Sequence, residues 1–355
     1  MGNKIVLFVV VLFTAASAHA ATIAREQVDA LVQPMVTGGY CKGAAVGLID
    51  AAGRRTVVGY GVTRTGGPVP DGKTVYEIGS ITKTFTATML AEMVLAGDVK
   101  LDQPVKELLP PGTIVPEKDG VQITLLNLAT QRSGLPRMPD NFNPADPWNP
   151  YVDYSPSKLY EALASIKLTR EPGERYEYSN LGVGLLGHAL TLKAGKSYES
   201  LLLEKICTPL GMNDTRTTLD DRLRSRLAPP HMGELVVENW DSDALAGAGA
   251  IRSTVDDMLT YLAAEAGIVD SPLSAPMKLT QQRRGDAGHG ADIGLAWHIG
   301  KRTGARWHDG GTGGYSTFAA FEPQKKVGVV VLVNSRCMMT DSVGTQLMKL
   351  MLGEH

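Results

Sequence analysis

The chain has 355 residues, which exceeds the usual size of one domain, so we expect two domains or one domain with a large insertion. Its content of 43% hydrophobic residues can fill a core and excludes a disordered protein. The 35 Lys and Arg residues are nearly balanced by 37 Asp and Glu residues without a basic run, which argues against nucleic acid as a partner.

Residues 1–20 have the pattern of a secretory signal peptide. Lys4 precedes the apolar run 5–13, and small residues follow up to Ala18-His19-Ala20, an Ala-x-Ala cleavage site. The apolar run is too short to cross a bilayer, which takes about 20 residues. We therefore expect cleavage after Ala20. The mature chain, residues 21–355, would be periplasmic or secreted, with no stable membrane anchor.

Strand-like segments lie near both ends of the mature chain. Residues 44–50 and 56–61 are apolar and β-prone, and the short segment between them predicts a hairpin. Residues 315–321 and 327–333 repeat this pattern around a turn. Because helical material separates the two pairs, we expect one sheet built by both ends of the chain.

The middle of the chain has helical spacing of apolar residues. Residues 81–95 predict a helix that stops at Gly97. The other predicted helices are 124–131, 156–166, 180–193, 198–206, 254–266 and the C-terminal segment 341–352. The Pro-rich loop 134–156 is long for a compact protein, and such loops usually form a functional rim.

The three cysteines give no metal or disulfide framework. Cys41, Cys207 and Cys337 are far apart and odd in number, and they form no Cys-x-x-Cys pair. One bridge can form in an oxidising compartment, but the sequence leaves its pairing open. Buried structural thiols are the favoured interpretation.

The strongest chemical signal is Ser80, followed three residues later by Lys83 at the start of a predicted helix. This spacing puts a hydroxyl and an amine on one helix face. A serine hydroxyl is a weak nucleophile until a base takes its proton, and a lysine can serve if its pKa falls from about 10.4. Ser155 and Lys158 repeat the spacing, but Ser155 followed by Pro is more simply a helix N-cap.

Tyr178 and Asn180 form a second element just before a predicted helix. A phenol near a lysine can act as a general base, and an Asn amide can hold a substrate carbonyl or orient the lysine. Taken alone, the triplet would be interpreted as a packed tyrosine with an Asn helix cap.

The third element is His308, followed by Asp309, Gly310 and Gly311 at the edge of a predicted strand. Glycines let a substrate backbone approach a strand edge closely. His-x-Gly also occurs at His231 and His298, and only His308 has the glycine cluster and the following strand.

With these three elements in this order, the sequence resembles the class C β-lactamase and low-molecular-mass penicillin-binding peptidase family, over nearly all of the mature chain. Within it, the chain is most similar to the periplasmic D-alanyl-D-alanine carboxypeptidase/endopeptidase branch. Further matches are found at residues 99–105, 123–128, 133–136 and 209–212.

The resemblance implies an α/β (α+β) fold, with an antiparallel sheet from the N- and C-terminal segments flanked by helices. The sheet part would cover about 21–75 and 290–355, and a mostly helical insertion about 76–289, with a cleft between them.

The resemblance also implies the roles of the site residues. Ser80 would attack the substrate carbonyl, with Lys83 and Tyr178 taking its proton. The backbone N–H groups of Ser80 and Gly311 would form the oxyanion hole, whose loss typically costs about 10²–10³ in rate. Asn180 would bind the substrate amide. The strand edge of His308, Gly310 and Gly311 would complete the binding site, and no metal or cofactor is expected.

The chain departs from the family pattern at this strand edge. Many members carry Lys-Thr-Gly where this chain has His308, Asp309 and Gly310. Neutral His and anionic Asp are poorer partners for a carboxylate than Lys and Thr, which puts efficient β-lactam hydrolysis in doubt. We expect His308 to face the substrate carboxylate, so that its protonation would make binding of anionic substrates depend on pH.

Two other enzyme classes are excluded. The sequence has no Gly-x-Ser-x-Gly elbow of an α/β-hydrolase, and its seven His residues form no metal-binding cluster. β-Lactams, D-Ala-D-Ala peptides of peptidoglycan and short-chain esters remain competing substrates for an acyl-Ser80 enzyme. A non-catalytic penicillin-binding sensor is the alternative from a different class.

Overall fold

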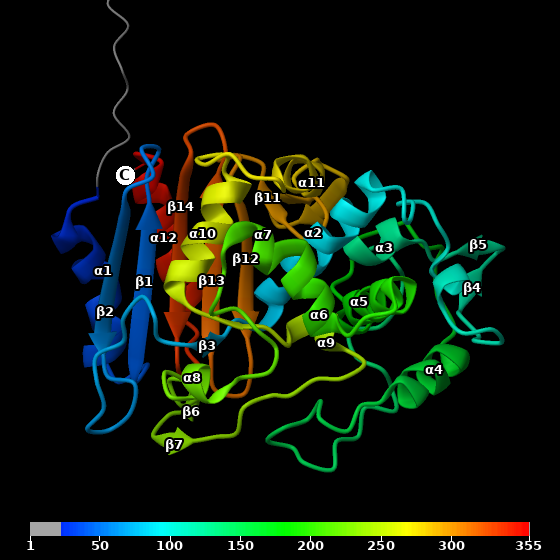
Figure 1. The fold of residues 1–355 in the computed structure, drawn as a ribbon, viewed down its shortest axis with the longest axis horizontal. Coiled ribbons are helices and arrows are strands. Elements are labelled where there is room, and N and C mark those ends of the chain that lie inside the picture. The colour runs from blue at the N-terminus through cyan, green and yellow to red at the C-terminus, as the bar shows by residue number, and fades with distance from the viewer. Residues whose placement is uncertain (1–22, 355) are drawn as a thin grey trace, which may run out of the picture.

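The computed structural model describes residues 23–354, so the signal-peptide prediction for residues 1–20 lies outside the described residues. The described chain forms one eight-stranded antiparallel sheet, in the order β2-β1-β14-β13-β12-β11-β10-β9 (Figure 1). The N-terminal hairpin therefore pairs with the last strand, which confirms the predicted sheet shared by both ends. Its strands are β1 (Gly43–Ile49), β2 (Arg55–Gly61), β9 (Gly285–Gly288), β10 (Ala291–Ile293), β11 (His298–Gly300), β12 (Arg306–Gly311), β13 (Ser316–Glu322) and β14 (Val327–Val333).

The central strands are covered on both faces, which is why they have continuous apolar sequences. In β1, Ala45 and Ile49 pack toward helix α10 (Val255–Glu265) in one core. Ala44 and Val46, with alternate orientation, pack toward α1 (Arg25–Thr37) and α12 (Thr340–Met351) in a second core. The sheet is thus the middle layer of three.

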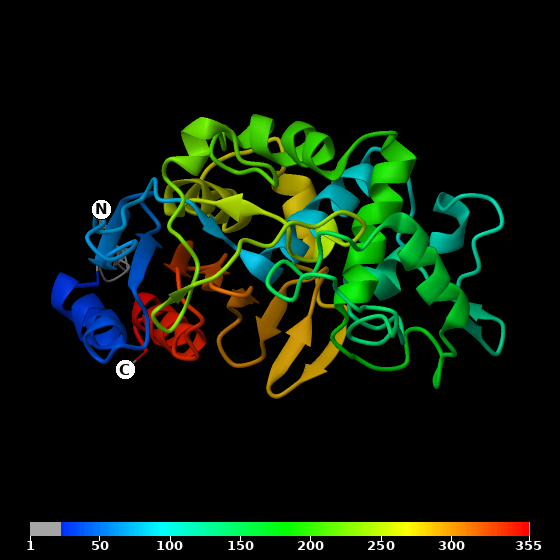
Figure 2. The same ribbon diagram turned by 90° about the horizontal axis from the view of Figure 1, so that it is seen from below.

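The helical region lies at the other end of the molecule, where Figure 2 shows its helices from below. Helix α2 (Thr82–Leu95) runs through its centre and packs against α5, α9 and α11. The remaining helices are α3 (Leu125–Ala129), α4 (Pro156–Ser165), α5 (Asn180–Ala194), α6 (Tyr198–Leu202), α7 (Thr208–Leu210), α8 (Asp221–Arg224), α9 (Ala246–Gly249) and α11 (Ser274–Thr280). Short strand pairs are β3 (Tyr76–Glu77) with β8 (Arg252–Ser253), β4 (Glu117–Lys118) with β5 (Val121–Gln122), and β6 (His231–Met232) with β7 (Leu235–Val236).

Helix α2 is buried on nearly all sides, although it carries several threonines. Their hydroxyls are satisfied inside the core. Thr84 Oγ1 donates to the carbonyl of Ile81 at 2.8 Å, and Thr86 Oγ1 donates to that of Gly247 at 2.8 Å. Because no hydroxyl needs water here, α2 can be the fixed central element that carries Lys83.

The predicted helices agree with the structure at most positions. The segment 198–206 is an exception, because α6 ends at Leu202 and a π-helical turn, Leu203–Cys207, follows. Helices α1, α7 to α9 and α11 and strands β9 to β11 were not predicted, and β12 was expected only as a strand edge at His308 to Gly311. None of the helices formed by residues 23–354 combines the length and the apolar character that crossing a bilayer requires.

Candidate active site

Ser80 lies in a 3₁₀ turn, Gly79–Ile81, that leads directly into α2. Gly79 has a φ of +51°, and a Cβ atom there would come within 2.6 Å of the backbone nitrogen of Gly311. Only glycine tolerates both conditions. The turn can therefore lie against the end of β12, which brings Ser80 next to the glycine pair of the strand edge.

Lys83 occupies the first turn of α2 and is 0% exposed. Its Nζ lies 2.9 Å from Ser80 Oγ and 2.6 Å from the carbonyl oxygen of Ala248 in α9. Burial lowers the pKa of Lys83 to about 7, with a further contribution from the positive charge of Arg137. An appreciable share of this amine is therefore neutral at neutral pH and can accept the Ser80 proton.

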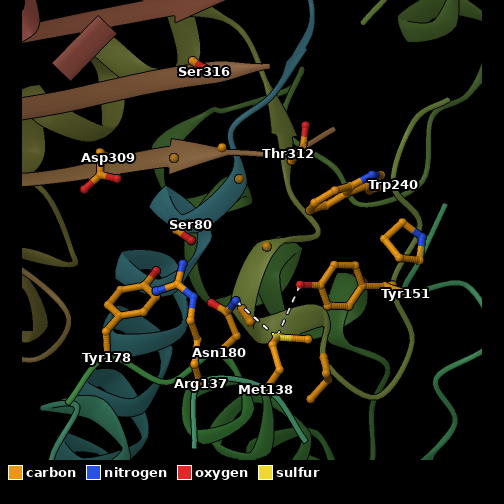
Figure 3. A pocket seen from close by; sticks show the side chains of 18 of the residues that line it. Ser80, Arg137, Met138, Tyr151, Tyr178, Asn180, Trp240, Asp309, Thr312 and Ser316 are labelled. Carbon is orange, nitrogen blue, oxygen red and sulfur yellow. Dashed lines mark hydrogen bonds between the residues drawn. The ribbon is translucent and has the colours of Figure 1, made fainter. Parts of the chain in front are cut away.

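Tyr178 lies just before α5 and lines the same cavity as Ser80. Its hydroxyl points toward Ser80 (Figure 3), and burial raises the pKa of this phenol. The next residue, Ser179, fixes the segment, because its Oγ accepts from Gly182 N at 2.8 Å and donates to the carbonyl of Pro136 at 2.6 Å. A protonated phenol held beside Ser80 can donate a proton.

Asn180 begins α5 and points into the cavity beside Met138 (Figure 3). Its Nδ2 lies 3.5 Å from Met138 Sδ. Its Oδ1 is buried and has no hydrogen-bond partner among residues 23–354. This free acceptor is suited to a substrate N–H group.

The cavity in front of Ser80 has a volume of about 740 Å³. The loop 134–156, expected to form a rim, contributes Arg137 and Tyr151 to its wall. Tyr151 packs against Trp240, with ring centres 5.3 Å apart. The remaining charged groups of the wall are Arg336, Asp309 and Asp341. The cavity thus combines an aromatic side with charges of both signs.

The position of His308 corrects the expectation that it faces a substrate carboxylate. Its side chain is 1% exposed and does not line the cavity, and Nδ1 lies 2.6 Å from the carbonyl oxygen of Asp309. Burial lowers the pKa of His308 well below its ordinary value, so the ring stays neutral near neutral pH. Side chains alternate along a strand, and it is Asp309 that lines the cavity.

The second Ser-x-x-Lys segment has the predicted structural role. Ser155 is the N-cap of α4, with Pro156 in the first turn. Lys158 Nζ pairs with Asp153 at 2.8 Å instead of facing Ser155. This arrangement supplies no free amine for the Ser155 hydroxyl.

Several residues of the cavity wall were not singled out by the sequence, among them Arg137 and Trp240. The Trp240 segment is held by Glu77, a buried carboxylate three residues before Ser80, whose Oε1 accepts from Trp240 N at 2.7 Å and from Asn239 Nδ2 at 2.9 Å. The long loop pointed to a rim but not to a particular residue in it. In the part of the chain that the structure describes, no group of His, Cys, Asp or Glu is arranged to hold a metal ion.

Comparison with known proteins gives a consistent result. The Beta-lactamase family model matches residues 28–347. The chain is 34% identical to the D-alanyl-D-alanine-carboxypeptidase/endopeptidase AmpH of Escherichia coli K12, covering 93% of this chain and 91% of that protein. It is 26% identical to a β-lactamase of Pseudomonas fluorescens, covering 88% and 94%. A crystal structure of a β-lactamase/D-alanine carboxypeptidase from Yersinia pestis, complexed with citrate, matches with a TM-score of 0.80 at 27% identity, covering 92% and 98%.

Proposed function

Because this chain belongs to the Beta-lactamase family of serine hydrolases, we propose that it is a penicillin-recognising enzyme that forms an acyl ester on Ser80. The observation that carries this proposal is the 2.9 Å contact between Lys83 Nζ and Ser80 Oγ. A hydroxyl becomes an effective nucleophile when a base takes its proton, and a buried lysine with a pKa of about 7 is such a base at neutral pH.

In the proposed acylation, the neutral Lys83 amine accepts the Ser80 proton while Oγ bonds to the substrate carbonyl carbon. The carbonyl oxygen becomes an oxyanion that accepts hydrogen bonds from the backbone N–H groups of Ser80 and Gly311. When the bond to the leaving atom breaks, the Tyr178 phenol gives that atom a proton and regains one from the Lys83 ammonium. Water, deprotonated by the same groups, then hydrolyses the acyl ester and frees Ser80.

D-Ala-D-Ala peptides and β-lactams are the substrates that we propose first. The similarity to a D-alanyl-D-alanine-carboxypeptidase/endopeptidase and to β-lactamases supports them. The free Oδ1 of Asn180 offers an acceptor for a peptide N–H, and Arg137 and Arg336 bring positive charge to the cavity for a terminal carboxylate.

Short-chain carboxylic esters are the second candidate, favoured by Asp309. This carboxylate lines the cavity at the strand edge, where it repels an anionic substrate. The aromatic side formed by Tyr151 and Trp240 is suited to a neutral acyl group. A neutral ester therefore avoids the repulsion that a penicillin or a peptide carboxylate meets from Asp309.

The proposed place of action is the periplasm or the cell exterior. The charged start, the apolar run 5–13 and the Ala18-His19-Ala20 site support export with cleavage after Ala20. N-terminal sequencing of the protein recovered from the periplasm should give Ala21 as the first residue. An uncleaved protein in the cytoplasm would contradict this proposal.

The function is tested by comparing a D-Ala-D-Ala peptide, a chromogenic cephalosporin and a p-nitrophenyl ester as substrates of residues 21–355. We expect turnover of at least one and none by Ser80→Ala. Near pH 9, where the Lys83 amine is neutral with or without the Asp309 charge, Asp309→Thr should raise kcat/KM for the two anionic substrates but not for the ester. Covalent labelling by a fluorescent penicillin without any turnover would replace the hydrolase with a sensor, and no labelling and no turnover would refute both.

A further inference from the structure

Arg137 is an exposed arginine in a loop, but its backbone and its guanidinium are both held in place. Its carbonyl oxygen accepts hydrogen bonds from Asn180 N at 3.0 Å and Leu181 N at 3.3 Å, which fixes its backbone to the start of α5. Its guanidinium carbon lies 4.9 Å from the centre of the Tyr178 ring. Among residues 23–354, no carboxylate forms an ion pair with this guanidinium.

Lys83 also contacts the aromatic ring of Tyr178. Its Nζ lies 5.0 Å from the centre of the Tyr178 ring, so this aromatic side chain contacts two cationic groups. An aromatic ring attracts cations through its negative face. The contact with Arg137 thus holds the phenol in place beside Lys83 and Ser80, and it places a permanent positive charge near a buried amine.

Asp309 supplies the opposing charge from β12. It lines the same cavity, and it forms no ion pair within the described part of the chain. Arg137 and Asp309 therefore act on the buried Lys83 and Tyr178 pair with opposite signs, from two different elements of the fold.

We propose that Arg137 is a positioning residue, which holds Tyr178 against Lys83 and brings a positive charge to this pair, and that Asp309 brings the opposing charge. This inference rests on the proposed function, because it assigns Lys83 as the base. It gives the loop 134–156 a role in setting the pH range of the enzyme as well as in forming the rim of the cavity.

The other titratable groups near Lys83 and Tyr178 add no charge to those of Arg137 and Asp309 near neutral pH. The 3₁₀ turn presents Ser80, the segment before α5 presents Tyr176, and the sheet presents His308 from β12 with His298 behind it on β11. Burial lowers the pKa of both histidines and raises that of Tyr176, so all three are neutral near neutral pH. Arg137 lowers the pKa of Lys83 and of Tyr178, and Asp309 raises both.

The charges of Arg137 and Asp309 determine the direction in which each substitution shifts the pH dependence of kcat/KM. A higher pKa of Lys83 means that less of the amine is neutral at low pH, so the acidic limb of the kcat/KM profile moves up in pH. Arg137→Gln should move it up, and Asp309→Asn should move it down. With Arg137 exposed to solvent, we expect about a threefold to tenfold loss of kcat/KM near pH 6 for Arg137→Gln and a much smaller loss near pH 9.

The experiment measures the pH dependence of kcat/KM for a neutral p-nitrophenyl ester, so that substrate charge plays no part. The variants are Arg137→Gln, Arg137→Lys, Asp309→Asn and Arg137→Gln/Asp309→Asn. Arg137→Lys keeps the charge and should restore the wild-type limb, and the double variant should lie near wild type. Arg25→Gln is the matched control, because Arg25 also stacks on a tyrosine, Tyr60, at 5.6 Å but lies on α1, away from the cavity.

A second readout needs no turnover. The ¹³C chemical shift of the Lys83 ε-carbon, assigned by its loss in Lys83→Met, reports the titration of the amine directly. The midpoint should rise in Arg137→Gln and fall in Asp309→Asn. The inference would be overturned if Arg137→Gln changed neither the acidic limb of the kcat/KM profile nor the titration midpoint of Lys83. If the wild type neither turns over nor acylates, the proposed function fails, while the lysine titration still decides the role of Arg137.

Discussion

The amine of Lys83 lies 2.6 Å from the backbone carbonyl oxygen of Ala248, so the group that faces Ser80 is held from a second side by α9. An ordinary surface lysine has no such constraint. The contact directs the nitrogen toward Ser80 without adding a negative charge that would keep the amine protonated. This is how the fold makes a lysine into a base.

The first prediction follows from this contact. Lys83→Met removes the amine and keeps much of the buried volume, so acylation should slow by about 10²-fold or more while the protein stays folded. The measurement is single-turnover acylation by a p-nitrophenyl ester or a fluorescent penicillin. Lys158→Met is the control, because Lys158 has the same spacing from a serine but pairs with Asp153. Equal rates for Lys83→Met and wild type would exclude Lys83 as the base.

The second prediction concerns Tyr178. In the proposed mechanism its phenol gives a proton to the leaving atom and takes part in activation of water. Tyr178→Phe should therefore slow both acylation and release of the acyl group, by about 10²-fold or more. Stopped-flow traces separate the two steps. A Tyr178→Phe enzyme with unchanged single-turnover rates would show that the phenol only packs against Lys83 and Arg137.

Much of the fold follows from local sequence patterns, and the missing parts have physical reasons. Strand β14 is a continuous apolar run because both faces are covered. Strands β10 and β11 have three residues each, too few to show alternation. Helix α1 contains Pro34, and its N-cap position is Ala24, which supplies no side-chain cap, so the helix lacks the usual start signal.

The site could be predicted where its members lie close together in the chain. Ser80 and Lys83 share a helix turn, and Tyr178 precedes a helix, so local spacing suffices. Arg137 could not be found, because its contact with Tyr178 joins two segments that only the tertiary structure brings together. The strand edge was located correctly, but which of His308 and Asp309 faces the cavity depends on the pleat, and that choice was wrong.

The third prediction concerns the cysteines. Cys41 precedes β1 and Cys337 follows β14, and the two segments lie side by side, with Asn334 N 3.2 Å from the carbonyl oxygen of Gly43. A hydrogen bond from the Cys41 thiol lowers the pKa of Cys337. In an oxidising medium we expect a Cys41–Cys337 disulfide, with Cys207 left as a buried free thiol.

Peptide mapping of the unreduced protein by mass spectrometry tests this pairing. Cys207→Ser should leave the cross-linked peptide unchanged, and Cys41→Ser should remove it and lower the melting temperature of the oxidised protein. A cross-linked peptide that contains Cys207, or three free thiols after treatment with oxidised glutathione, would contradict the assignment.

The fourth prediction concerns Glu265, a buried carboxyl in α10 that is 3% exposed. It accepts hydrogen bonds from Gln281 Nε2 at 2.7 Å and Trp297 Nε1 at 3.2 Å, but burial raises its pKa to about 7. The folded state thus retains a proton that the unfolded chain loses at lower pH. The contribution of Glu265 to the free energy of unfolding is fully present below the pKa that this carboxyl has in the unfolded chain. It is lost as pH rises through about 7, by up to about 3 kcal/mol.

Thermal unfolding between about pH 5 and pH 8 measures this loss. Glu265→Gln should flatten the decline of the melting temperature with pH, even if the amide costs one hydrogen bond and lowers the melting temperature overall. Glu238→Gln is an exposed control that should keep the wild-type slope. The same slope in Glu265→Gln and wild type would show that other groups cause the decline.

The central claim is that Ser80 carries the acyl group. The most direct measurement is intact-mass and peptide mass spectrometry of the protein after brief incubation with a penicillin or a slowly hydrolysed ester. We predict one acyl adduct per chain, located on the peptide that contains Ser80, absent in Ser80→Ala and unchanged in Ser155→Ala. An adduct on any other residue, or an adduct of equal yield in folded Ser80→Ala, would contradict the account.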